Sequence, residues 1–132
     1  MKELKFNSQI CTTREQSQRL LDLGLNPETA DMNWTIKDED REGNEYSVEY
    51  RSIGRGTYHS LHPNWYIPAW SMHRLIEMCN KTQFGMTISV YNNEVTVDGD
   101  LFELSDNTYD NLISVIEWLI KGGHFKKEYL KQ

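Results

Sequence analysis

Arginine, histidine and aromatic residues gather in one stretch of the sequence that contains no Asp or Glu, between Glu49 and Glu77. Such side chains suit an anionic, planar or peptide ligand, because Arg forms forked hydrogen bonds and stacks on aromatic rings. The alternative is a long loop whose rings pack under a sheet and whose arginines neutralise an acidic loop. The binding residues predicted in this stretch are Arg51, Arg55, Tyr58, His59, His62, Trp65 and Tyr66.

Two of these residues also raise the question of a metal. His59 and His62 have a spacing that is sometimes seen in metal sites, which makes a small metal-dependent hydrolase the first alternative function. A zinc site would need a third ligand, such as His73 or a carboxylate. Pro63 disfavours a helical conformation at His62, so the pair would not project from one helical face. We therefore predict no metal ligand and no cofactor.

Other catalytic patterns are missing from the sequence. There is no Gly-x-Ser-x-Gly, no phosphate-binding loop and no Gly-x-Gly-x-x-Gly. Asp98-Gly99-Asp100 predicts a hairpin turn, because it lacks the alternating oxygen ligands of a calcium loop. Cys79 belongs to an apolar helical stripe, and Cys11 has no His or Cys partner nearby in sequence. No residue is predicted to be catalytic, and we expect a binding protein rather than an enzyme.

Composition limits the class of protein. The 132 residues predict a single globular domain over 1–132, and 38% hydrophobic residues with four Trp argue against disorder. The net charge of -6 makes nucleic-acid binding a poor expectation, although an acidic nucleic-acid mimic remains a second alternative, on the strength of the acidic run 38–45. Two distant cysteines, no signal-peptide pattern and no apolar run of about 18 residues predict a reduced, cytoplasmic protein without a membrane span. The sequence gives no indication of the oligomeric state.

Periodicity predicts helices over 14–23, 72–79 and 108–121, with a short helical turn after Asn26. The first helix begins with a capping box, either Thr12 with Glu15 or Thr13 with Gln16. Ser71 is predicted to cap the second helix, and Trp70 to be buried against it, while Trp65 and Tyr66 lie near the surface.

Alternating apolar residues predict strands over 32–36, 46–50, 86–90 and 95–97, with a further strand over 101–104. A turn at 92–93 would pair Val90 with Val95 and Ile88 with Val97, and would place Phe102 beside Val95. The predicted fold class is α+β: a mostly antiparallel sheet of four or five strands, with two main helices and one shorter helix packed against it. Residues 51–70 would form its longest irregular connection.

A resemblance to a known protein family rests on three stretches of the chain: Thr12 to Met32, Pro68 to Ser71, and Tyr109 to Ile120. They include the runs Thr29-Ala30-Asp31-Met32, Pro68-Ala69-Trp70-Ser71 and Tyr109-Asp110-Asn111-Leu112. The chain resembles a family of small uncharacterised proteins found in gut-bacterial (Bacteroides-like) genomes and their prophages. The resemblance implies a phage or mobile-element accessory protein in a bacterial cytoplasm, and it carries over no catalytic or binding residue.

Overall fold

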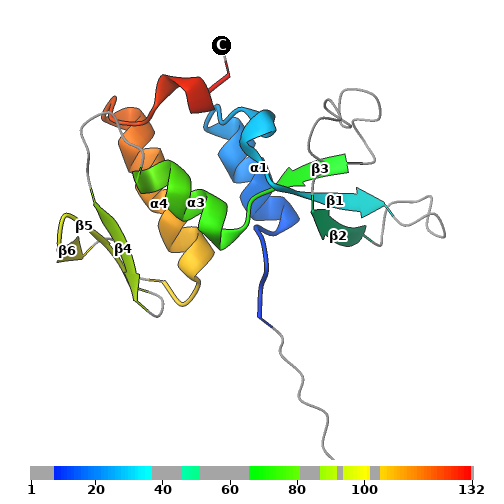
Figure 1. The fold of residues 1–132 in the computed structure, drawn as a ribbon, viewed down its shortest axis with the longest axis horizontal. Helices are drawn as coiled ribbons and strands as arrows, with labels where there is room; N and C mark the ends of the chain where they lie inside the picture. Colours follow the sequence, from blue (N-terminus) through cyan, green and yellow to red (C-terminus); the bar gives the residue numbers. More distant parts are fainter. Residues whose placement is uncertain are drawn as a thin grey trace, which may run out of the picture.

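The structure is a computed structural model that describes residues 8–36, 46–50, 66–80, 87–91, 94–101 and 105–131. Within these ranges three α-helices and six antiparallel strands make the fold α+β (Figure 1). The helices are α1 (Arg14–Asp22), α3 (Met72–Asn80) and α4 (Thr108–Lys121), with short 3-10 turns η1 (Pro27–Thr29) and η2 (Lys127–Tyr129). The strands are β1 (Met32–Ile36), β2 (Tyr46–Tyr50), β3 (Tyr66–Ala69), β4 (Ile88–Tyr91), β5 (Glu94–Val97) and β6 (Asp100–Leu101).

Helix α1 begins and ends where local sequence signals predict. Thr13 is the N-cap: its Oγ1 accepts from the Gln16 amide at 3.1 Å, and the Gln16 side chain accepts from the Thr13 amide at 2.9 Å. Gly24 has φ of +98°, and the Leu25 amide donates to the Leu20 carbonyl at 3.2 Å. This hydrogen bond and the burial of Leu20 and Leu25 complete a Schellman motif, so the predicted helix end is confirmed.

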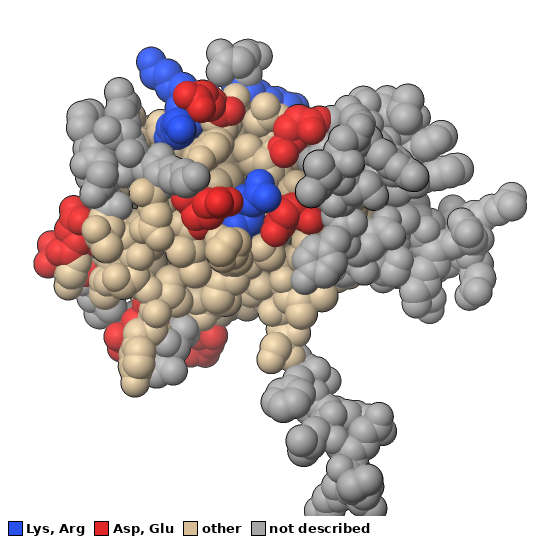
Figure 2. Space-filling model, viewed as in Figure 1, with Lys and Arg blue, Asp and Glu red and all other residues tan. Residues whose placement is uncertain are grey.

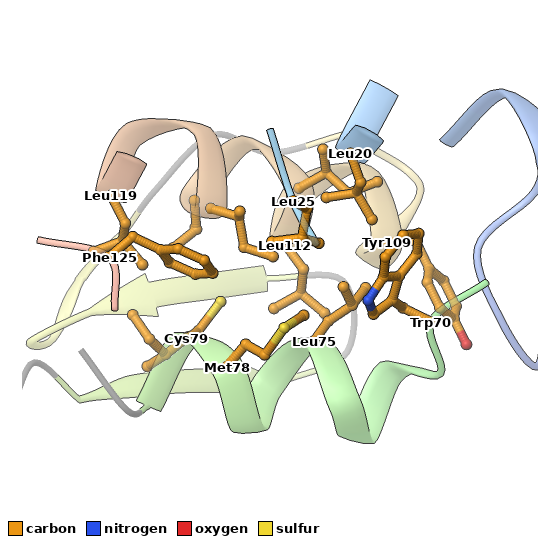
Figure 3. Close-up of a cluster of buried hydrophobic side chains, with 14 of the residues drawn as sticks. Leu20, Leu25, Trp70, Leu75, Met78, Cys79, Tyr109, Leu112, Leu119 and Phe125 are labelled. Carbon is orange, nitrogen blue, oxygen red and sulfur yellow. The ribbon is translucent and has the colours of Figure 1, made fainter. Parts of the chain in front are cut away.

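The main core lies where α1, α3 and α4 meet (Figure 3). Helix α3 contributes Leu75, Met78 and Cys79 to it, and these side chains point toward α4. Each fully buried aliphatic side chain stabilises the fold by about 1.5–3 kcal/mol. The aliphatic α4 residues that are fully buried are Leu112, Ile113, Val115, Ile116 and Leu119.

Trp118 lies at the edge of the buried face of α4. It is 41% exposed, and its ring lies 5.7 Å from the His124 ring. It lies two residues beyond the buried Ile116 and one before the buried Leu119, so the helical turn of 100° per residue carries it to the edge of the apolar face.

The prediction of one sheet of four or five strands is not supported. Among the described strands, pairing produces two three-stranded sheets, with the orders β2-β1-β3 and β4-β5-β6. Strand β3 takes the second edge of β1, so no edge of β1 remains for the other hairpin. In Figure 1 the two sheets lie on opposite sides of the helices: β4 and β5 contact α3 and α4, whereas β3 contacts α1.

The predicted pairing of the second hairpin is confirmed. Val90 pairs with Val95, and Ile88 with Val97. The predicted Asp98-Gly99 turn is also confirmed, because these residues have φ of +52° and +88°, as a tight hairpin turn requires. Strand β6 covers only residues 100 and 101, so the predicted position of Phe102 lies outside the described residues.

In the first sheet the apolar positions also face one another. Trp34 pairs with Val48 on one side of β1 and with Ile67 on the other. Residues that pair directly share a face, so Met32 and Trp34 of β1 lie on the same face as Ala69 and Ile67 of β3. On this face Met32 and Ala69 pack with the buried Cys11, and Trp34 lies against them.

The last residues of the chain return to the end of α1. Gly123, with φ of +73°, ends α4, and the chain then buries Phe125 in the core (Figure 3). The Asn26 amide donates to the Tyr129 carbonyl, and the Lys131 amide to the Gly24 carbonyl, each at 2.8 Å. These hydrogen bonds flank an antiparallel bridge between Leu25 and Leu130, which fixes η2 against the segment that follows α1.

Within the described residues, no helix combines the length and the apolar character that crossing a membrane requires.

Candidate functional site

Most of the predicted binding residues cannot be placed. The described ranges exclude Arg51, Arg55, Tyr58, His59, His62 and Trp65, and therefore also the possible His59–His62 metal pair. Tyr66 is the first residue of β3, where its backbone pairs with Thr35, and its side chain is not described. The proposed binding site consequently remains a prediction from sequence.

Tyr50 and Tyr66, the described residues on either side of residues 51–65, lie on different strands of the first sheet. Tyr50 ends β2 opposite Met32, and Tyr66 begins β3 opposite Thr35. Because β2 and β3 flank β1, the two ends of the stretch lie on opposite sides of β1 and toward opposite ends of it.

One part of the stretch is regular, in contrast to the prediction of an irregular connection over all of 51–70. Residues Tyr66–Ala69 form β3, an edge strand of the first sheet. An edge strand tolerates Pro68, because one side of the strand needs no ladder hydrogen bond.

Trp70 belongs to the core, as predicted. Its exposed fraction is 0%, and its indole Nε1 donates to Thr29 Oγ1 at 2.9 Å. Its amide donates to Thr12 Oγ1 at 3.0 Å, and its carbonyl accepts from the Thr12 amide at 2.9 Å. Trp70 therefore links the end of β3 to the start of α1 and to η1, and its ring is not available to a ligand.

A serine and a carboxylate meet just before α3, in an arrangement worth testing for chemistry. Asp31 accepts from both the amide and the hydroxyl of Ser71, at 2.9 and 2.5 Å. Ser71 Oγ in turn accepts from the Arg74 amide at 3.2 Å, which is the contact of a helix cap. The predicted cap is confirmed, and the pair has a structural role.

Arg74, the cation nearest the end of the acid-free stretch, is also held within the fold. Its Nη1 donates to the Thr29 carbonyl at 3.0 Å, and its Nε lies 3.3 Å from Glu77 Oε1. These contacts fix the start of α3 to the turn before β1.

A polar network that the sequence did not predict joins the first turns of α1 and α4. Gln16 Nε2 donates to Asp110 Oδ1 at 2.8 Å and to Asn107 Oδ1 at 3.2 Å. Gln9 completes it, donating to Gln16 Oε1 at 2.7 Å and accepting from Asn107 Nδ2 at 3.0 Å. The only signal in the sequence was the capping role of Gln16, which gives no information about contacts with α4.

Both thiols lie in surroundings that suppress their reactivity. Burial raises the pKa of Cys79 to about 12. Burial, together with the negative charge of Asp31, raises the pKa of Cys11 to about 11. Since the thiolate is the nucleophile and the metal ligand, both groups are poorly suited to either role at neutral pH. The described ranges also contain no group of three His, Cys, Asp or Glu residues placed to hold a metal ion.

Charges of both signs are mixed on the face of the molecule seen in Figure 2. Among the described residues, Glu117 lies 2.7 Å from Lys121 Nζ and 3.0 Å from Arg19 Nη2. Hydrogen bonds from Lys121 and Arg19 lower the pKa of the Glu117 carboxyl. Such pairing differs from the continuous acidic face that a nucleic-acid mimic would need.

Comparison of the chain with protein-family models, with curated proteins and with solved structures found no match. Its function is therefore inferred from the residues of the chain itself.

Proposed function

We propose that this protein is a non-enzymatic binding or accessory protein of phage or mobile-element origin. It engages another protein, or an anionic ligand, through residues 51–70. The observation that carries the proposal is the composition of this stretch: it combines arginine, histidine and aromatic residues without a single carboxylate, in a chain whose net charge is -6. Arginine and aromatic side chains are enriched at the energetic centres of protein interfaces.

Two residues near this stretch that were not among the predicted binding residues are engaged within the fold. Trp70 is fully buried and hydrogen-bonded, and Arg74 is engaged by Thr29 and Glu77. The proposal therefore depends on the cations and rings between 51 and 66.

The candidate chemistry in the described part supports binding over catalysis. The Ser71 hydroxyl serves as a helix cap, and the two thiols have raised pKa values. These three groups are therefore poorly suited to act as nucleophiles.

The charge of the stretch predicts how binding would respond to salt. Contacts between exposed arginines and a negatively charged partner weaken as ionic strength rises, because salt screens exposed charges over about 10 Å at 0.1 M. A purely apolar contact would not show this dependence.

The test uses matched triple variants in an affinity capture from lysate of the bacterial host. The site variant carries Arg51→Ala, Arg55→Ala and Trp65→Ala. The control carries Lys121→Ala, Lys131→Ala and Tyr91→Ala, which removes two cations and one ring from exposed positions elsewhere. Equal melting temperatures for the two variants would show that both are folded.

Two readouts cover the two kinds of partner. If the partner is a protein, we expect the wild type and the control, but not the site variant, to retain a host or phage protein that mass spectrometry identifies. If the partner is an anionic ligand, we expect the wild type and the control, but not the site variant, to bind immobilised polyglutamate with a salt-sensitive affinity. If neither readout separates the site variant from the control, the proposal is wrong.

A further inference from the structure

We draw no further inference here: the strongest candidate, the surface patch that Trp118 of α4 forms with the neighbouring His124 ring, is a half-exposed aromatic face, and nothing in the described part of the structure shows what would cover it.

Discussion

Replacing Trp70 by alanine should remove a large share of the stability of the fold. The side chain is fully buried in the core to which α1, α3 and α4 contribute (Figure 3). Its Nε1 donates to Thr29 Oγ1 at 2.9 Å. Emptying a buried tryptophan site costs about 3–5 kcal/mol, because the transfer energy and the cavity energy add. The free energy of unfolding of a domain is about 5–15 kcal/mol, so Trp70→Ala should leave the protein marginally stable.

A graded series of substitutions at Trp70 separates the packing of its ring from the hydrogen bond that its N–H donates. Trp70→Phe keeps most of the ring but removes the N–H donor, and the lost hydrogen bond should cost about 0.5–1.5 kcal/mol, in addition to a small cavity. Trp118→Ala is the matched control, because that ring is 41% exposed and should cost about 1 kcal/mol.

Urea unfolding followed by far-ultraviolet circular dichroism measures these losses without relying on tryptophan fluorescence. The dependence of unfolding free energy on urea should keep the same slope in all variants if only stability changes. In thermal melts the loss for Trp70→Ala corresponds to a fall of about 10–20 °C. A loss below that of Trp118→Ala would refute the assignment of Trp70 to the core.

The same assay tests the neighbouring aromatic residues. We expect the more exposed of Trp65 and Tyr66, changed to alanine, to cost well under 1 kcal/mol and to weaken binding instead. Large, equal losses for Trp65, Tyr66 and Trp70 would show that the whole stretch is core, and the proposed binding role would fall.

Four further predictions concern Gly24, the labelling and the titration of the two thiols, and the metal alternative. Gly24→Ala should lower the free energy of unfolding by about 1 kcal/mol, because φ is +98° there; Gly24→Asn should cost less, and equal losses in thermal melts would contradict the argument. Cys11 and Cys79 should resist a thiol reagent at pH 8 until urea unfolds the chain; rapid labelling of folded protein would show that they are not buried. Because these thiols keep their protons in the folded state above the ordinary pKa of 9.0, stability should fall as pH rises from 9.0 toward about 11 for Cys11 and about 12 for Cys79. Protein purified without a His tag should contain no zinc, and added zinc should leave its melting temperature unchanged; a rise that is abolished by His59→Ala or His62→Ala would support the hydrolase alternative.

Signals that act over a few residues predicted much of the helical structure. The box of Thr13 and Gln16 and the positive φ of Gly24 depend only on neighbours in the chain, so the bounds of α1 could be inferred before any tertiary contact was known. The pairing of Ile88 with Val97 was equally accessible, because a two-residue turn leaves one register that places the apolar residues on one face.

The division into two sheets could not be predicted in this way. Strand β3 pairs with β1 although about thirty residues of chain separate them. Pro68 also made this strand hard to predict, because a proline in the sequence usually argues against a strand. The network of Gln16 with Asn107 and Asp110 likewise depends on which helix ends meet, which no local pattern encodes. Six of the seven predicted binding residues lie outside the described ranges, so the site itself is still a hypothesis.

The attachment of η2 beside Gly24 and Leu25 has a consequence for how the protein is made. The two hydrogen bonds that flank the Leu25–Leu130 bridge join residues from nearly opposite ends of the described chain. While residues 124–131 are still inside the ribosome, Phe125 cannot join the core to which α1, α3 and α4 contribute. Completion of this core must therefore wait until synthesis has passed residue 131, and contacts so distant in sequence favour slow folding.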